Sequence, residues 1–104
     1  MKVWLDDIRP LPEDYDVLML TGEECIELIL TGTVTEISFD HDLGEGINGY
    51  EVARKIEELA YFDKIPRIKW HIHTSNPVGL KSIFSAMKSA DNSWHSHAAG
   101  EEHV

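Results

Sequence analysis

Three titratable residues in a row, Asp40, His41 and Asp42, follow a short apolar run and precede a glycine-rich segment. Neither a strand nor a turn needs this combination of side chains in order to fold. A carboxylate can bind a metal ion or accept a phosphoryl group, and an imidazole can transfer a proton near neutral pH. The triplet therefore marks a candidate site, and the fold must show which other residues reach it.

Two further groups of chemically active side chains also stand at or near the ends of apolar runs. The first group is the acidic pair Asp6 and Asp7. The second group consists of His71, His73, Thr74, Ser75 and Asn76. Ligands of open parallel sheets bind beyond the carboxyl ends of the strands. If the runs are parallel strands, we expect these residues to converge with Asp40 at one edge of the sheet.

The elements that would position these residues alternate between strands and helices. Apolar runs predict strands at residues 2–7, 17–21, 36–39 and 67–74. Thr21 and Asn48 are expected to cap two helices, and a third is expected to begin at Pro77. This order predicts an α/β domain with a parallel sheet of about four strands. Residues 9–16, with their prolines, are expected to form a loop in place of the first crossover helix.

The expected domain covers residues 1–90. Leu80, Ile83, Phe84 and Met87 give the third helix an apolar core face, and this periodicity fades after Ala90. Residues 91–104, which contain His95, His97 and His103, are expected to form a mobile tail.

The three aspartates Asp6, Asp7 and Asp40 predict a metal site. Like charges on neighbouring strands repel unless a cation joins them. A donor set made only of oxygen suits Mg²⁺ or Mn²⁺, and Asp42 is a further candidate ligand. A single aspartate in such a place would more simply cap a turn, so the prediction depends on the convergence of all three.

His71 and His73 are two residues apart in a strand, so their rings should share one face of the sheet. With Asp40 they are the candidate catalytic residues, as a general acid and base. They could instead bind a metal ion, which would favour Zn²⁺, Mn²⁺ or Fe²⁺. His41 is a candidate phosphate ligand, although strand alternation leaves its direction open.

The start of the third helix is a candidate anion site. Thr74, Ser75 and Asn76 lead directly into it, and free N–H groups at a helix start bind phosphate well. Simple capping of the helix by Asn76 is the alternative interpretation. An anion site beside a divalent ion would suit the handling of a phosphate group.

Composition limits the partners that we expect. The net charge is -10 over 104 residues, which is unfavourable for binding a long nucleic-acid backbone. A small phosphorylated ligand or nucleotide held through a metal ion remains compatible with this charge. The single cysteine, Cys25, allows no internal disulfide, and no apolar run is long enough to cross a membrane. We expect a cytoplasmic protein, and a homodimer would cover the poorly protected sheet edge.

The motifs "VWLDD" and "ISFDHDLG" resemble the receiver domains of two-component response regulators. That resemblance implies a three-layer, flavodoxin-like fold with Asp6 and Asp7 as the acidic pair. It also implies Asp40 as the phosphoryl acceptor, with Thr74 or Ser75 as the hydroxyl residue that ends the fourth strand. The chain departs from receivers because it shows no clear fifth strand and no match for the lysine found there.

These departures resemble a more specific group, the small phage and bacterial proteins described as cyclic-phosphate processing receiver-like domains. The segments "WLDDIRP", "SFDHDLG" and "HIHTSNPVG" carry this resemblance. It implies enzymatic handling of a phosphate ester or a cyclic phosphate. Together with the aspartates, it leads us to expect a metal-dependent phosphoesterase that acts on a cyclic phosphate or a cyclic nucleotide. Two alternatives stay open: a signalling module phosphorylated on Asp40, and a binder that sequesters a phosphorylated ligand without turnover.

Overall fold

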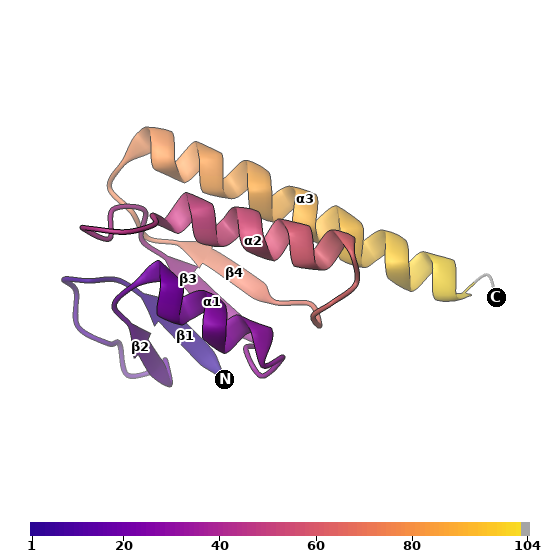
Figure 1. Cartoon of the computed structure of the whole chain (residues 1–104), viewed down its shortest axis with the longest axis horizontal. Helices are drawn as coiled ribbons and strands as arrows, with labels where there is room; N and C mark the ends of the chain where they lie inside the picture. The colour runs from indigo at the N-terminus through magenta and orange to yellow at the C-terminus, as the bar shows by residue number, and fades with distance from the viewer. Residues whose placement is uncertain (103–104) are drawn as a thin grey trace.

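Four short strands form one parallel sheet in the order β2-β1-β3-β4 (Figure 1). A computed structural model describes residues 1–102, so the predicted tail residue His103 lies outside the described residues. The strands are β1 (Lys2–Leu5), β2 (Val17–Met19), β3 (Glu36–Phe39) and β4 (Lys69–Ile72). The helices are α1 (Gly22–Leu30), α2 (Gly49–Tyr61) and α3 (Pro77–Glu102). The predicted α/β fold with a four-stranded parallel sheet is therefore confirmed.

The helices begin where the sequence predicts, because a polar side chain caps each first turn. The Thr21 hydroxyl accepts a hydrogen bond from the Glu24 N–H at 3.2 Å. Asn48 and Glu51 form a reciprocal capping box at the start of α2. No helix in the described part of the chain combines the length and the apolar composition needed to cross a lipid bilayer.

All three helices cover the same face of the sheet (Figure 1). Val3, Leu5, Ile37 and Phe39 are fully buried in the core on that face. The other face carries the register row Trp4, Ser38 and His71, and no helix of residues 1–102 covers it. The described residues thus form a shortened receiver-like fold, in which one helical layer packs on the sheet. The second helical layer is missing because the β1–β2 connection is the predicted loop and does not form a helix.

The expected mobile tail is also wrong for residues 91–102, which continue α3. Trp94 is only 7% exposed, and its Nε1 donates to the Ile65 carbonyl at 3.2 Å. Nε2 of His97 donates to the carbonyls of Ala60 and Tyr61, at 3.0 and 2.9 Å, where α2 ends. A helical period is therefore present in this segment, but alanine, tryptophan and histidine occupy its inward positions.

The core face of α3 differs from the prediction in two residues. Ile83 and Met87 are fully buried, whereas Leu80 and Phe84 are 41% and 50% exposed. Phe84 packs edge-on against Trp70 of β4, at 5.6 Å between ring centroids. These two side chains face the outer edge of the sheet because β4 is the last strand on that side.

Candidate functional site

The carboxyl ends of β1, β3 and β4 place the candidate residues at one edge of the sheet. Backbone pairing continues for one residue beyond the strands: Asp40 donates to the Leu5 carbonyl at 2.9 Å, and His73 donates to the Phe39 carbonyl at 2.9 Å. The polar residues after the strands therefore start from fixed backbone positions. Asp6, Asp40 and His73 meet because neighbouring parallel strands end together.

Asp6, Asp7 and Asp40 form an acidic cluster. One carboxylate oxygen from each residue lies within 4.8 Å of the other two. Oδ1 of Asp7 is buried and has no hydrogen-bond partner. The side chain of Arg9 contributes one cation, with Nε 4.0 Å from Asp6. Three carboxylates in so small a volume, with an oxygen atom left unpaired, fit a hard divalent ion such as Mg²⁺ or Mn²⁺.

Asp6 is the most enclosed member of this acidic cluster, with no exposed surface. Its Oδ1 accepts the N–H groups of Ile8 and Arg9 at 2.8 and 2.9 Å, and its Oδ2 lies 2.9 Å from Nε2 of His73. Burial alone would raise the pKa of Asp6, but these hydrogen bonds and the nearby imidazole lower it below its usual value. Asp6 is therefore ionised near neutral pH.

The imidazole of His73 is restrained on both of its nitrogens and on one ring face. Nδ1 lies 2.8 Å from Oγ of Ser38, and Nε2 contacts Asp6. The ring stacks on Trp4 with centroids 3.8 Å apart and planes 6° apart. Burial lowers the pKa of His73 below its usual value, although the negative charge of Asp6 opposes the shift. The ring is therefore neutral at pH 7.

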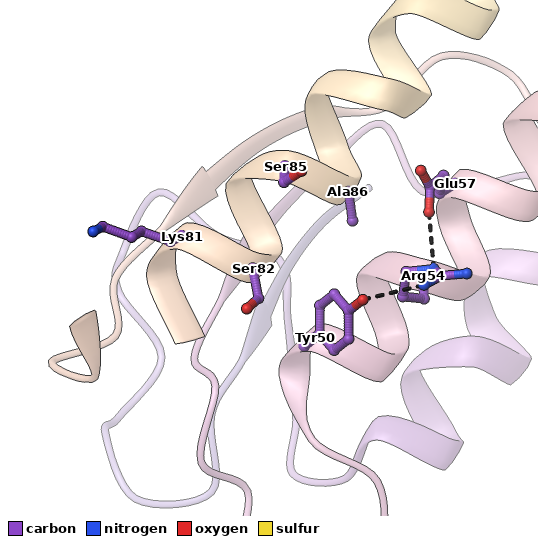
Figure 2. A pocket seen from close by; sticks show the side chains of 7 residues that line it. All are labelled: Tyr50, Arg54, Glu57, Lys81, Ser82, Ser85 and Ala86. Atoms are coloured by element: carbon purple, nitrogen blue, oxygen red, sulfur yellow. Dashed lines mark hydrogen bonds and ion pairs between the residues drawn. The ribbon is translucent and has the colours of Figure 1, made fainter. Parts of the chain in front are cut away.

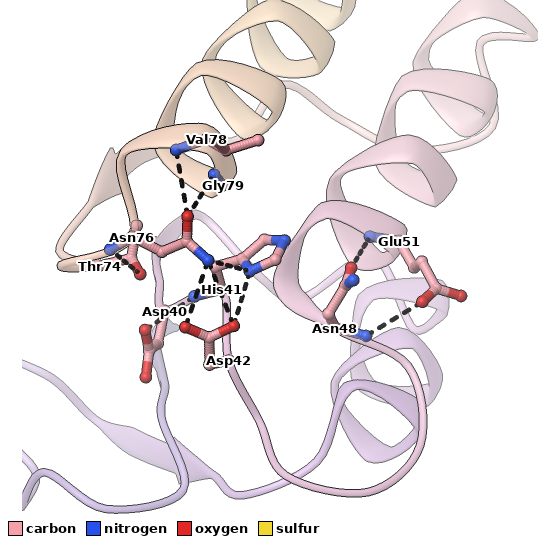
Figure 3. Close-up of polar contacts among 9 residues, drawn as sticks. All are labelled: Asp40, His41, Asp42, Asn48, Glu51, Thr74, Asn76, Val78 and Gly79. Carbon is pink, nitrogen blue, oxygen red and sulfur yellow. Dashed lines mark hydrogen bonds and ion pairs between the residues drawn. The ribbon is translucent and has the colours of Figure 1, made fainter.

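His41, Asp42 and Asn76 make a second polar cluster, where the loop after β3 meets the start of α3 (Figure 3). Nδ1 of His41 lies 2.9 Å from Oδ1 of Asp42, and Nδ2 of Asn76 lies within 3.5 Å of both residues. The hydrogen bond from His41 lowers the pKa of the exposed Asp42 carboxyl. The His41 ring packs directly against Gly79 in the first turn of α3. A side chain at position 79 would meet this ring.

The family model of the cyclic-phosphate processing receiver domain matches residues 1–89. The chain belongs to this family. The match includes all four strands, the acidic cluster and the second polar cluster, and it ends within α3. Comparisons with curated proteins and with solved structures found no match.

Among the residues predicted for the site, this receiver domain brings together Asp6, Asp7, Asp40 and His73. Asp42, a predicted metal ligand, lies instead against His41 and Asn76. The predicted catalytic residue His71 does not reach the acidic cluster. Its side chain is 59% exposed, and its Nε2 lies 3.4 Å from Glu36.

The predicted anion site at the start of α3 is filled by the helix's own cap. Oδ1 of Asn76 accepts the N–H groups of Val78 and Gly79 at 3.1 and 3.0 Å (Figure 3). The Thr74 hydroxyl accepts the Asn76 N–H at 3.2 Å, and Ser75 is exposed. The alternative interpretation, capping of the helix by Asn76, is therefore what the structure shows. The side-chain N–H₂ group of Asn76 still points toward Asp42 and His41.

Sequence reasoning missed three residues that contact the site: Trp4, Ser38 and Arg9. Trp4 and Ser38 precede Asp6 and Asp40 by two positions, so strand alternation puts each on the same face as its aspartate. The positions of this tryptophan and this serine in the sequence could therefore have indicated that both side chains lie beside the site. Nη1 of Arg9 donates to the His73 carbonyl at 2.6 Å, which fastens the β1–β2 loop to the end of β4.

A separate surface hollow of about 380 Å³ lies between α2 and α3 (Figure 2). Its most prominent charge, the Arg54 guanidinium, is already paired with Glu57 at 2.9 Å and donates to the Tyr50 hydroxyl at 3.1 Å. The remaining lining residues are Lys81, Ser82, Ser85 and Ala86. Because the clustered carboxylates lie elsewhere, we assign the candidate site of this family member to the acidic cluster.

Proposed function

We propose that the protein is a metal-dependent phosphoesterase that opens a cyclic phosphate, either in a cyclic nucleotide or at a 2′,3′-cyclic phosphate end. The observation that carries the proposal is the acidic cluster. Three carboxylates converge within 4.8 Å, and a buried oxygen of Asp7 has no partner. The family description, cyclic-phosphate processing, supports this class of substrate.

In this proposal Asp6, Asp7 and Asp40 hold a Mg²⁺ or Mn²⁺ ion. Such an ion, when bound, stabilises negative charge on the phosphoryl oxygens and activates a water molecule. The chain's own groups orient the ligand. The proposed contacts to phosphoryl oxygens are the imidazole of His41, which follows Asp40 and is fixed by Asp42, and the side-chain amide of Asn76. We leave His71 out of the catalytic group because it faces solvent beside Glu36.

The proposed partner is a small phosphorylated ligand or nucleotide in the cytoplasm. A net charge of -10 is unfavourable for long polyanions, whereas one phosphate group can be held through the ion's own charge. The net charge therefore favours a small-molecule enzyme over a binder of long nucleic acids.

The test is hydrolysis of 2′,3′-cyclic and 3′,5′-cyclic mononucleotides, followed by chromatography, with Mg²⁺, Mn²⁺ or EDTA. We expect turnover with an ion and none with EDTA or in Asp40→Asn. Asp14→Asn is the matched control, because it makes the same change of charge on an exposed loop. Wild-type turnover by Asp40→Asn would contradict the proposal. Binding without turnover would favour the sequestering alternative, and a phosphoryl group on Asp40 after treatment with acetyl phosphate would favour the signalling one.

A further inference from the structure

Ser38, His73 and Asp6 form a continuous chain of hydrogen bonds that ends at the acidic cluster. The Ser38 Oγ to His73 Nδ1 distance is 2.8 Å, and the His73 Nε2 to Asp6 Oδ2 distance is 2.9 Å. We propose that Ser38 and His73 are positioning residues, which orient Asp6 for binding the divalent ion, and that His73 does not exchange protons with the substrate. This inference rests on the proposed metal-dependent function and assigns a role to two residues within it.

The direction of each hydrogen bond follows from the chemistry of the partners. An ionised carboxylate only accepts hydrogen bonds, so Nε2 of His73 must carry a proton that points at Asp6. A neutral imidazole then has a lone pair on Nδ1, which accepts the proton of the Ser38 hydroxyl. The carboxylate of Asp6 therefore selects this His73 tautomer, and the Ser38 hydroxyl, which can donate or accept, holds the other side of the ring. Ser38 is only 2% exposed, so this role needs no contact with a ligand.

The packing of His73 is also that of a positioning group. Trp4 covers one ring face, both ring nitrogens have partners, and the side chain is only 12% exposed. A proton-transferring imidazole must reach the reacting group. Both nitrogens of His73 point instead at buried side chains, Ser38 and Asp6.

Three hydrogen bonds fix the orientation of the Asp6 carboxylate. Two backbone N–H groups hold Oδ1, and His73 holds Oδ2. Only the remaining lone pairs are left for an ion shared with Asp7 and Asp40. Hydrogen-bonding groups behind metal ligands typically contribute about 10–100-fold to metal affinity. Loss of the His73 contact would leave Asp6 buried but less well oriented.

The test measures the affinity of Mn²⁺ for the apoprotein, by electron paramagnetic resonance of free Mn²⁺. His73→Gln keeps an amide donor near the position of Nε2, whereas His73→Asn places its amide near Nδ1, toward Ser38 and away from Asp6. We expect roughly 10–100-fold weaker binding for His73→Asn and Ser38→Ala, and recovery of much of the affinity in His73→Gln. His71→Asn is the matched control, because it changes a histidine two residues earlier, outside the hydrogen-bonded chain, and it should bind as wild type does.

A second measurement needs no variant. The ¹⁵N shifts of His73 in the wild-type protein should show the neutral tautomer with its proton on Nε2. A proton on Nδ1 would overturn the inference, as would His73→Asn and Ser38→Ala variants that are folded and bind Mn²⁺ like wild type. Either result would leave the proposed function standing. If the wild-type protein bound no Mn²⁺, the metal-dependent function itself would fall, and the inference with it.

Discussion

Nε2 of His73 lies 2.9 Å from Oδ2 of Asp6, although 67 residues separate them and their strands are not neighbours in the sheet. β3 runs between β1 and β4, and Ser38 lies on β3 in the register row of Trp4 and His71, two residues before Asp40. The small serine side chain lets the His73 ring lie across β3, where it also stacks on Trp4. A bulky residue at position 38 would separate the two partners.

This pair makes stability fall on acidification. The folded-state pKa of His73 lies below 6.5, so the unfolded chain binds more protons as the pH falls through that value. The folded-state pKa of Asp6 lies below 3.8, so its contribution is present above about pH 4 and is lost as the pH falls further. We expect the free energy of unfolding, measured with urea and without divalent ions, to decrease from about pH 6.5 downward.

The variant His73→Gln should remove the part of this decrease that lies between pH 4 and 6.5, because glutamine does not titrate. His71→Asn should leave that part in place. If His73→Gln kept the full wild-type slope over this range, another group would be responsible for the pH dependence.

The acidic cluster predicts opposite effects of one substitution with and without an ion. Asp7→Asn removes one of three mutually repelling charges, so in EDTA its stability should equal or exceed that of wild type. With Mg²⁺ the wild-type protein should gain stability, by roughly 2.7 kcal/mol at 100 times Kd, and Asp7→Asn should gain little. Thermal unfolding in the two buffers measures both effects, with Asp14→Asn as the control for charge. An equal Mg²⁺ response in Asp7→Asn and wild type would argue against Asp7 as a ligand.

Much of the site was predictable because it depends on strand order alone. Alternating strands and helices imply a parallel sheet, and the residues after β1, β3 and β4 must then meet at one edge. Asp6, Asp7, Asp40 and His73 follow from this argument. The same alternation correctly placed His71 on the face of His73. His71 comes two residues earlier in the chain, however, so its side chain lies too far from the carboxyl ends of the strands to reach the acidic cluster.

Features that depend on packing between distant segments were not predictable in the same way. The spacing of Trp94 and His97 fits a helix, but only the loop around Ile65 and the end of α2 explain why these residues turn inward. Asp42, which was predicted to bind a metal ion, pairs with His41. This pairing depends on the position of Asn76, which directly precedes α3 and contacts Asp42. Loss of the second helical layer follows from the loop at residues 9–16, yet the resemblance to receivers implied three layers.

Gly49 allows α2 to start directly against the site. A Cβ atom at this position would collide with the main-chain carbonyl of Asp40, which cannot move without moving the Asp40 side chain. We expect Gly49→Ala to lower the free energy of unfolding by about 1–3 kcal/mol and to weaken Mn²⁺ binding. In Gly79→Ala the new methyl group meets Cβ and Cγ of His41, so the imidazole must shift, although alanine favours the helix by about 1 kcal/mol. A side chain yields more easily than a main-chain carbonyl, so this variant should lose less stability than Gly49→Ala, and equal losses in the two variants would contradict the steric argument.

The last part of α3 should contribute to the stability of the domain. Trp94 is buried against Ile65, and its Nε1 donates to the Ile65 carbonyl. Trp94→Ala should therefore lower the free energy of unfolding by about 3–5 kcal/mol, as measured by urea denaturation. His95→Ala is the matched control, since it changes a neighbouring exposed residue of the same helix and should have an effect within about 0.5 kcal/mol. His97→Ala removes the donor to the last carbonyls of α2 and should cost about 1 kcal/mol. If Trp94→Ala and His95→Ala were equally stable, residues 91–102 would behave as the mobile tail that the sequence alone predicts.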